Sequence, residues 1–534
     1  MLTNKPLNNL YRWLKTWAKL KPLQFVKTLQ QEFPAAKFYL VGGMVRDLAL
    51  GRPSKDFDLV VTGVPAKPLE AALEKLGRVN LVGKNFGVFK FTPRGGDPSD
   101  PIDVALPRTE HAFGTGGYRD VEVQSDPKLP IENDLARRDF TINSMALKLN
   151  SEFRISNFEI DSKLKIQNSK FLVDPFGGLD DLVKKTIRCV GKPEERFHED
   201  YSRMLRAIRF ACQLDFEIEP ATWKAVMQHI KHLNREINGN RIVPSEVIAK
   251  ELVKAVVAYP VWALELLDDS GAVSTLMPEL LKMKRCPQPP QFHSEGDVWT
   301  HTVLALTKLG SKEFHKEFKN QNSKKDKNLQ PTTYNLQPEL VWATLFHDLG
   351  KPYTLTVTDR IRTNGHDIKG AKVFAQIAER LKLASTGLNV AAIEWLIAKH
   401  LIATYAKRDQ MKETTVEKYF FNDQVPGRQL LQLTFVDIAA TVPPSGKPDF
   451  TAYRQLKNRV QSLQRRLAAK QRLPRALLDG NAIMKILKLP PSRHIGEIKE
   501  YLREQQLGGK IKTKAQAKKA VLNKFDTPDS RRYR

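Results

Sequence analysis

Two aspartates one residue apart, Asp56 and Asp58, are the first sign of chemistry in this chain of 534 residues. They stand in a segment that reads as a strand, and alternate side chains of a strand point to the same face. Two carboxylates on one face can hold a pair of Mg²⁺ ions, which steady the attacking and leaving oxygens of a phosphoryl displacement. The spacing therefore predicts a site for metal-dependent nucleotidyl transfer.

A glycine pair and an arginine precede these aspartates. Residues 37–41 predict a strand, and residues 44–50 predict a short helix. Gly42 and Gly43 then lie at the N-terminus of a helix, where free N–H groups attract a triphosphate. Arg46 stands between the glycines and the aspartates. An ordinary turn followed by an ordinary strand end is the alternative, but finding both pieces in so short a stretch disfavours it.

A third carboxylate comes from Asp103, in the apolar run 101–106. We expect this run to pair beside the first strand, which makes Asp103 a candidate catalytic residue together with Asp56 and Asp58. A lone aspartate in a strand is more often a solvated edge residue, so both interpretations stay open.

Composition points to a polyanionic partner. The formal net charge is +27, and residues 503–534 carry ten lysines and arginines against three acidic residues. A solvated basic tail is the alternative for that segment. The three cysteines are unclustered, which argues against a disulfide framework and favours a reducing cytoplasm. No apolar run approaches the roughly 18 residues of a membrane span.

The pattern along the chain predicts an α+β protein. Strands alternate with helices up to residue 150, and the rest is almost entirely helical. Two polar stretches, 151–170 and 310–338, have the composition of disordered insertions. In chain order we expect an N-terminal helical extension (1–35), a head (36–150), an insertion loop (151–170), a helical neck and body (171–270), a second metal-binding domain (271–445) that includes the second insertion, and a basic, RNA-binding C-terminal tail (446–534).

Five ordered segments resemble the bacterial class II tRNA nucleotidyltransferases, which are the CCA-adding enzymes and their poly(A) polymerase relatives. The segments are residues 40–47, 55–58, 134–146, 174–178 and 199–210. The resemblance implies a polymerase-β-like head that uses Mg²⁺ and a helical neck that reads the incoming base. It also implies transfer of CMP and AMP from CTP and ATP to the 3′ end of tRNA.

By matching positions, the resemblance also implies residue roles. Asp56 and Asp58 would bind the metal, and Asp139 and Asn143 would lie near the ribose. The implied nucleotide-binding residues are Gly43, Arg46, Arg138, Asp139, Asn143, Asp200, Arg203, Arg206 and Arg209.

Asp200 and Arg203 also suggest base selection from their chemistry alone. On a predicted helix they stand at i and i+3, hence on one face. The carboxylate only accepts and the guanidinium only donates hydrogen bonds, which complements the amino group and ring nitrogen of cytosine and adenine. Uracil and guanine present the reverse order, at a cost of about 1–3 kcal/mol per unpaired group. A helix salt bridge is the alternative.

A second group of residues has metal-ligand chemistry. Its members are His301, His347, Asp348, His366, His400 and Asp437. Imidazoles and carboxylates suit a transition metal or Mg²⁺ that acts on a phosphoester. The pattern resembles the HD phosphohydrolase superfamily, above all in the doublet His347–Asp348 before a Gly-Lys turn, and it implies a phosphohydrolase activity for this domain.

Two other functions stay open. The nearest is a poly(A) polymerase, or an enzyme that adds only CC or only A, with the same head. Residues 82–87 lack the second basic residue before Phe86 that is associated with bacterial poly(A) polymerases, which favours tRNA. The other is an HD phosphohydrolase whose head only binds RNA, but a head that only binds needs no adjacent metal carboxylates.

Overall fold

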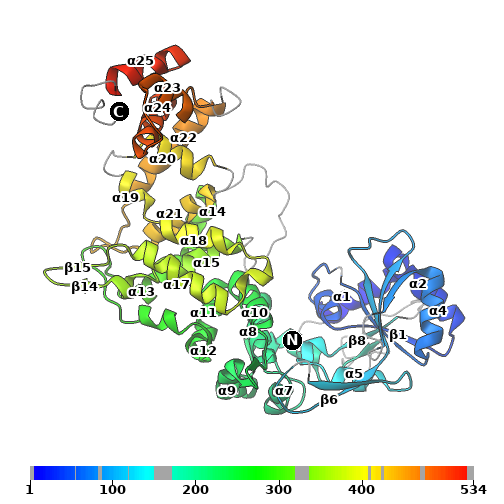
Figure 1. Cartoon of the computed structure of the whole chain (residues 1–534). Coiled ribbons are helices and arrows are strands. Elements are labelled where there is room, and N and C mark those ends of the chain that lie inside the picture. Colours follow the sequence, from blue (N-terminus) through cyan, green and yellow to red (C-terminus); the bar gives the residue numbers. More distant parts are fainter. Residues whose placement is uncertain are drawn as a thin grey trace. The chain divides into compact units, whose positions relative to one another are not determined.

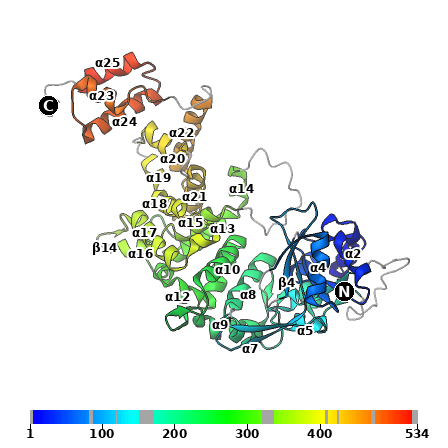
Figure 2. The same ribbon diagram turned by 45° about the vertical axis from the view of Figure 1, so that its right-hand side comes forward.

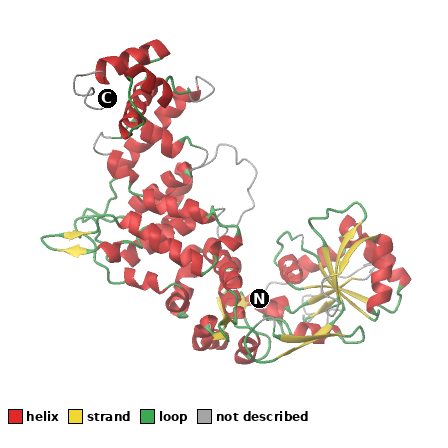
Figure 3. Cartoon of the chain, in the orientation of Figure 1, coloured by secondary structure: helices red, strands yellow, loops and turns green. Residues whose placement is uncertain are grey.

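The computed structural model describes residues 5–54, 56–81, 87–117, 120–149, 171–318, 336–406, 411–422, 426–468 and 475–525. It divides into two compact units, of which unit 1 ends at Met277 and unit 2 begins at Pro278. The sequence places the corresponding boundary between residues 270 and 271. The strands gather in the first part of unit 1 and helices make up most of the rest, which confirms the predicted α+β class (Figure 3).

The head of unit 1 is built around one sheet. Its elements in chain order are α1 (Lys5–Leu14), α2 (Gln24–Glu32), β1 (Lys37–Val41), α3 (Gly43–Ala49), β2 (Asp58–Thr62), α4 (Ala66–Leu76), β3 (Gly77–Leu81), β4 (Val88–Pro93), β5 (Ile102–Ala105), β6 (Arg108–Ala112), β7 (Val121–Ser125), α5 (Ile131–Ala136), β8 (Ala146–Leu149) and β9 (Leu172–Val173). The predicted strand 37–41 and the short helix after it are both present.

The sheet has seven strands in the order β3-β4-β5-β2-β1-β8-β9. β1 pairs antiparallel with β2 and β8, whereas β2 and β5 run parallel. The last strand, β9, follows the 151–170 segment in sequence, so the sheet of the head is completed by residues beyond that segment. β6 and β7 form a separate hairpin.

Helices cover both faces of this sheet, which explains why its central strands are apolar on both sides. Tyr39 and Val60 pack with Ile131 and Leu135 of α5 in one core cluster. On β4, Phe91 packs against Phe25 of α2, with ring centroids 4.6 Å apart. Figure 1 shows α2 and α4 beside the sheet. These two cores hold the ends of β2 and β5, where the carboxylates lie.

The neck of unit 1 is helical. It contains α6 (Gly178–Lys184), β10 (Thr186–Ile187), α7 (Pro193–Glu199), α8 (Ser202–Leu214), β11 (Glu217–Ile218), α9 (Pro220–His229), β12 (Glu236–Ile237), β13 (Asn240–Arg241), α10 (Ser245–Ala258), α11 (Pro260–Asp269) and α12 (Ala272–Leu276). α8 packs along α10. Most of α8 is buried, including Arg209. A buried guanidinium needs hydrogen-bond partners, so the neck must contain polar groups in its interior.

Unit 2 is almost entirely helical. It contains α13 (Val298–Leu309), α14 (Lys312–Phe318), α15 (Pro338–Phe346), α16 (Lys351–Thr354), β14 (Thr356–Val357), β15 (Ile361–Arg362), α17 (His366–Arg380), α18 (Val390–Lys399), α19 (Ile402–Ala406), α20 (Glu413–Phe420), α21 (Gly427–Ala440), α22 (Thr451–Ala468), α23 (Gly480–Leu487), α24 (Arg493–Leu507) and α25 (Lys514–Phe525). α13, α15, α18 and α21 pack against one another and form a helical core within this unit.

One expectation for unit 2 is wrong for part of its residues. The stretch 310–338 was expected to be a disordered insertion, but residues 312–318 form α14. Phe314 of that helix is buried, with its ring 6.2 Å from that of Phe435. Contact with a distant helix therefore outweighs the polar composition around it. Residues 319–335, like residues 150–170 of the first insertion, lie outside the described part.

The expected basic tail forms a folded helical region. α23, α24 and α25 enclose a core of their own, which includes Ile483, Ile498 and Val521. Figures 1 and 2 both show these three helices grouped together. In the described part of the chain, no helix combines the length and apolar character needed to cross a membrane.

Candidate functional site

The predicted catalytic carboxylates meet at one edge of the head sheet. Asp58 is the first residue of β2, and its partner in the parallel pairing with β5 is Asp103. Lys90 of β4 pairs with Asp103 from the other side, with Nζ 3.0 Å from Oδ1. Asp56 was expected on the same strand, but it precedes β2 and is exposed. The pairing of β2 with β5 thus brings Asp58 and Asp103 side by side.

The charge around Asp58 favours a cation. Burial raises the pKa of Asp58, Arg138 lowers it, and the nearby Asp103 and Asp56 raise it, which together bring it to about 6. Gly42 has a φ of 72° and allows the approach of Arg138, since a Cβ there would lie 2.8 Å from Nη1 of that arginine. Neighbouring carboxylates held at such a site fit a divalent metal ion, because its charge offsets their repulsion.

Four of the predicted nucleotide-binding residues form one hydrogen-bonded chain. Arg46 donates from Nη1 to Oδ1 of Asn143 at 2.8 Å, and Asn143 donates from Nδ2 to Asp139 at 3.2 Å. Arg206 of α8 donates twice to Oδ2 of Asp139, at 2.8 and 2.6 Å. These hydrogen bonds link α3 of the head to α8 of the neck through residues that are far apart in sequence.

Arg209 joins this network through a residue that the sequence analysis missed. Glu251 of α10 accepts from Nε of Arg209 at 2.5 Å and lies 3.8 Å from Arg206. The guanidinium of Arg209 also lies over the ring of Phe210, 4.0 Å from its centroid. Glu251 therefore pairs with Arg209 and lies near Arg206, which Asp139 also holds.

Asp200 and Arg203 are close in space, but not as predicted. Asp200 has an extended backbone between α7 and α8, so the two residues do not share a helix. Oδ1 of Asp200 accepts from the N–H of Ser202 at 2.8 Å, and burial raises its pKa. The guanidinium of Arg203 is held by Glu199, with Nη1 2.5 Å from Oε2.

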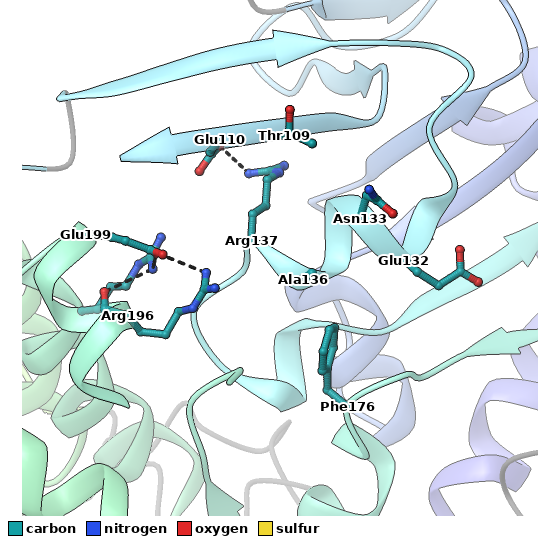
Figure 4. Close-up of a pocket in the computed structure, with 10 residues that line it drawn as sticks. Thr109, Glu110, Glu132, Asn133, Ala136, Arg137, Phe176, Arg196 and Glu199 are labelled. Carbon is teal, nitrogen blue, oxygen red and sulfur yellow. Dashed lines mark hydrogen bonds and ion pairs between the residues drawn. The ribbon is translucent and has the colours of Figure 1, made fainter. Parts of the chain in front are cut away.

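Arg203 lines a pocket of about 490 Å³ between the head and the neck (Figure 4). Arg137 and Glu110, joined at 2.6 Å, belong to its wall in the head. Arg196 and Glu199, 3.1 Å apart, belong to its wall in the neck. The pocket is thus lined by polar groups that can contact a base or a phosphate.

The second predicted cluster converges inside unit 2. All of its histidines and Asp348 are buried. The nitrogen Nε2 of His301 lies 3.1 Å from Asp437, and that of His347 lies 3.3 Å from Asp348. On the other side of Asp348, Nε2 of His366 lies 3.3 Å from Oδ1.

The nitrogens of these histidines are arranged as metal ligands. Nδ1 of His347, His366 and His400 lies 2.7–2.8 Å from a main-chain carbonyl, which can only accept, so each Nδ1 carries the proton. Nε2 is then the nitrogen through which each ring can bind a metal ion once it is deprotonated. The Nε2 atoms of His366 and His400 face each other at 3.2 Å, and that of His347 is buried without a hydrogen-bond partner.

Such an arrangement requires positive charge at the centre. Burial lowers the pKa of His347, but the neighbouring Asp348 and Asp437 outweigh it and raise this pKa to about 10, so without a metal the imidazole holds a proton that a metal ion would displace. The ligand atoms fall into two groups, and within each group all of them lie within 4.8 Å of one another: His301, His347 and Asp437 form one, and Asp348, His366 and His400 the other. Imidazole nitrogens and carboxylates in this arrangement fit a divalent metal ion.

Comparison with known proteins identifies the two domains in which most of these residues lie. Residues 38–188 match the family described as the poly A polymerase head domain, and residues 322–430 match the HD domain. The Multifunctional CCA protein of Nitrosospira multiformis is 32% identical over 358 residues, which are 67% of this chain and 72% of that protein. The chain belongs to the multifunctional CCA protein family. Its head and HD domain both imply the use of divalent metal ions.

Other relatives support this membership. The Multifunctional CCA protein of Stenotrophomonas maltophilia is 32% identical over 385 residues, 71% of this chain and 79% of that protein. The CCA-adding enzyme of Bacillus stearothermophilus, solved in complex with CTP, has a TM-score of 0.57 at 19% identity and covers 96% of this chain and 100% of its own. The Thermotoga maritima CCA-adding enzyme complexed with tRNA has a TM-score of 0.52 at 20% identity and covers 92% of each chain. The solved structures share the fold of this member of the CCA family, and the predicted resemblance is confirmed.

Several site residues of this CCA family member escaped the sequence analysis. Asp134 is fully buried and pairs with both Arg137 and Arg138, at 2.7 and 3.0 Å. Arg137 and Arg138 follow Asp134 at i+3 and i+4, a spacing that predicts ion pairs along one face of a helix. Glu251 and Lys90 lie far in sequence from the residues they contact, and only the fold reveals them.

The Asp139 network predicts a stability that depends on pH. Burial disfavours the ionised carboxylate, but Arg206 outweighs it and lowers the pKa of Asp139 to about 2. A lowered folded pKa stabilises the fold above the unfolded value near 4, and this stabilisation is lost as pH falls from about 4 to 2. We expect Asp139→Asn to cost on the order of 2 kcal/mol at pH 7.

This cost can be followed by thermal unfolding of the wild type and the variant between pH 7 and 2. The difference in Tm should be constant above about pH 5 and should shrink towards pH 2. The matched control is Glu122→Gln, which changes an exposed carboxylate on β7. A difference that stays constant down to pH 2 would contradict the assigned pKa.

Proposed function

We propose that this chain adds CMP and then AMP to the 3′ end of tRNA, using CTP and ATP. The observation that carries the proposal is the pairing of Asp58 with Asp103 at the edge of the head sheet, within reach of Arg138 and of the Arg46 network. Relatives named as CCA proteins support the choice of reaction.

In this proposal the head performs the chemistry. Asp56, Asp58 and Asp103 would hold Mg²⁺, which supplies positive charge to the reacting phosphate when it is bound. Gly43, at the start of α3, and Arg46 would contact the triphosphate. Orientation by such fixed groups contributes much of the rate of phosphoryl transfer, because it replaces an encounter in solution.

The neck would position the sugar and the base. Asp139 and Asn143 are fixed by Arg206 and Arg46, so their oxygens are oriented before a ribose arrives. Asp200 and Arg203 would read the base beside the pocket, where Glu199 fixes the direction of the Arg203 guanidinium. Oδ1 of Asp200 is used by Ser202, so Oδ2 is the oxygen that we assign to the amino group of C or A.

The C-terminal region offers a surface for the RNA. In α22 much of the positive charge is used internally, since Lys457 pairs with Glu317 and Arg466 with Glu413. Around α25, by contrast, Lys512, Lys514, Lys518 and Lys519 are exposed. We assign phosphate contacts with tRNA to this lysine cluster, because exposed lysines bind a polyanion without sequence preference.

The test of this function is incubation of the protein with tRNA that lacks its 3′ end and with each nucleotide singly or in pairs. CTP alone should extend the RNA by two residues, and ATP should add one residue only after CTP. Addition of long A tracts would identify a poly(A) polymerase. Use of only one nucleotide would identify an enzyme that adds CC or A alone.

Base selection predicts a specific defect. Replacing Asp200 or Arg203 by alanine should slow addition. It should also relax discrimination against UTP and GTP by roughly 5- to 150-fold. In the wild type the wrong base leaves this side chain without a hydrogen-bond partner, and the variant no longer has the side chain that carries this cost. The measurement is the kcat/KM for each of the four nucleotides. Lys192→Ala, which removes an exposed ion pair with Glu195 on the neighbouring helix, is the control. Equal loss for all four nucleotides would make the pair structural.

A second activity is favoured by the cluster in unit 2. We propose that His301, His347, Asp348, His366, His400 and Asp437 hold one or two divalent ions, either Mg²⁺ or a transition metal, and that the HD domain hydrolyses phosphoesters. The observation in favour is that the Nε2 atoms of the histidines converge on two carboxylates. Lys351, with Nζ 2.6 Å from Asp348, is placed to attract a phosphate to the same site.

A further inference from the structure

Glu295 is a buried carboxylate, and the roles described so far do not use it. It lies next to the HD cluster, by which we mean His301, His347, Asp348, His366, His400 and Asp437. Its side chain is 2% exposed. Oε1 lies 2.8 Å from Nδ1 of His301 and 2.7 Å from Nδ1 of His293, and Oε2 accepts from the N–H of Val442 at 3.0 Å. A carboxylate that receives three N–H donors is held in its ionised form.

The partner of His301 differs from those of the other histidines for a structural reason. His347 and His400 end helices, and Nδ1 of each bonds a carbonyl three residues earlier, in the last turn, where helix carbonyls have no other partner. His301 lies inside α13, and there the carbonyl of Val298, three residues earlier, accepts from the Thr302 hydroxyl. Nδ1 of His301 therefore needs a partner from outside the helix, and Glu295 supplies it.

Glu295 also connects two elements that carry ligands. His301 stands on α13, and Asp437 stands on α21, which ends just before Val442. The main chain repeats this link, because the N–H of Ser294 donates to the carbonyl of Val442 at 2.7 Å. The segment around Glu295 thus fixes α13 against the end of α21, where His301 and Asp437 approach to 3.1 Å.

We propose that Glu295 is a positioning residue of the HD metal centre, which sets the tautomer and orientation of His301 and strengthens it as a ligand. This rests on the proposal that the HD cluster binds a divalent metal. A carboxylate behind a ligating imidazole makes the opposite nitrogen a better donor, and loss of such a partner typically weakens metal affinity by 10- to 100-fold. His293 shares the carboxylate without being a ligand.

The experiment measures metal affinity rather than activity. Full-length protein is stripped with EDTA and titrated calorimetrically with Ni²⁺, with Asp58→Ala as the common background so that the head contributes little. The heat that disappears in His347→Ala defines binding at the HD cluster. Glu295→Gln keeps the shape of the side chain but places an amide where the ionised carboxylate stood, and it should raise the Kd for Ni²⁺ by about 10- to 100-fold.

Two controls separate positioning from other effects. Glu317→Gln changes another partly buried carboxylate of unit 2, which accepts from Tyr453 and Lys457 at 2.5 Å, and it should leave the Kd unchanged. His293→Ala should also leave it within about threefold, and the rise in Tm on adding Ni²⁺ should follow the same order among the variants.

Each result decides a separate point. Wild-type affinity in Glu295→Gln, or an equal loss in Glu317→Gln, would overturn the role of Glu295. Loss of binding in His293→Ala would show that His293, Glu295 and His301 hold the ion themselves, which also overturns it. Absence of any Ni²⁺ heat that depends on His347 would instead refute the metal site on which the inference rests.

Discussion

Asp58→Ala should abolish incorporation of both CMP and AMP, with a loss on the order of 10³-fold or more, because fixed charge at the reacting phosphate supplies most of the stabilisation of its transition state. Asp56→Ala should have a comparable effect if both aspartates bind metal. Binding of tRNA should be nearly unchanged, since the lysine cluster around α25 lies on unit 2. Incorporation and RNA affinity are measured on the same preparations.

Asp97→Ala is the matched control, because Asp97 is an exposed carboxylate of the head that bonds only Ser99 among the described residues. Activity of this variant should equal that of the wild type. Residual incorporation above a few per cent in Asp58→Ala would reject the metal role of that residue. A parallel loss of tRNA binding would instead indicate that the head itself holds the RNA.

The local elements of this site are predictable from sequence because short-range rules determine them. The strand 37–41 and the helix after it follow from hydrophobic pattern and from glycine positions, and both form as expected. The partner of Asp58 needs more information. Its pairing with Asp103 depends on β2 and β5 being neighbours, which a single apolar run around residue 103 suggests but does not determine.

The break between α7 and α8 shows why other parts of the site cannot be predicted from sequence without the fold. The sequence reads as one helix through Asp200, but the N–H of Tyr201 donates to the carbonyl of Gly116 in the head at 3.0 Å. A Cβ at Gly116 would lie 2.0 Å from the Tyr201 ring, so that contact also requires glycine. A long-range bond therefore ends α7 and frees Asp200 to bond Ser202.

Side chains that only hold the functional residues in place are also hard to predict from sequence. The identities of the histidines and aspartates of the HD cluster were predictable because the residue types themselves indicate metal chemistry. Glu251 and Glu295 have no such signal, since a lone glutamate is usually a solvated surface residue. Their roles follow from burial beside arginines or histidines that arrive from other helices.

His347→Ala or Asp348→Ala should eliminate phosphohydrolase activity on 2′,3′-cyclic or terminal phosphates and should leave CMP and AMP addition within about twofold. The two proposed metal sites belong to different units, and in our proposal the head supplies its own metal ligands. Because nucleotide substrates bring part of their Mg²⁺ coordination with them, no HD ligand is needed for addition.

The assay runs both reactions on one purified preparation of each variant, with circular dichroism to show that the fold is intact. His315→Ala, on the exposed side of α14, is the matched histidine control and should retain both activities. A chelator selective for transition metals should suppress only hydrolysis if the HD ion is a transition metal, and neither activity if it is Mg²⁺. Loss of nucleotide addition together with hydrolysis in a folded His347→Ala protein would show that the two sites do not act independently.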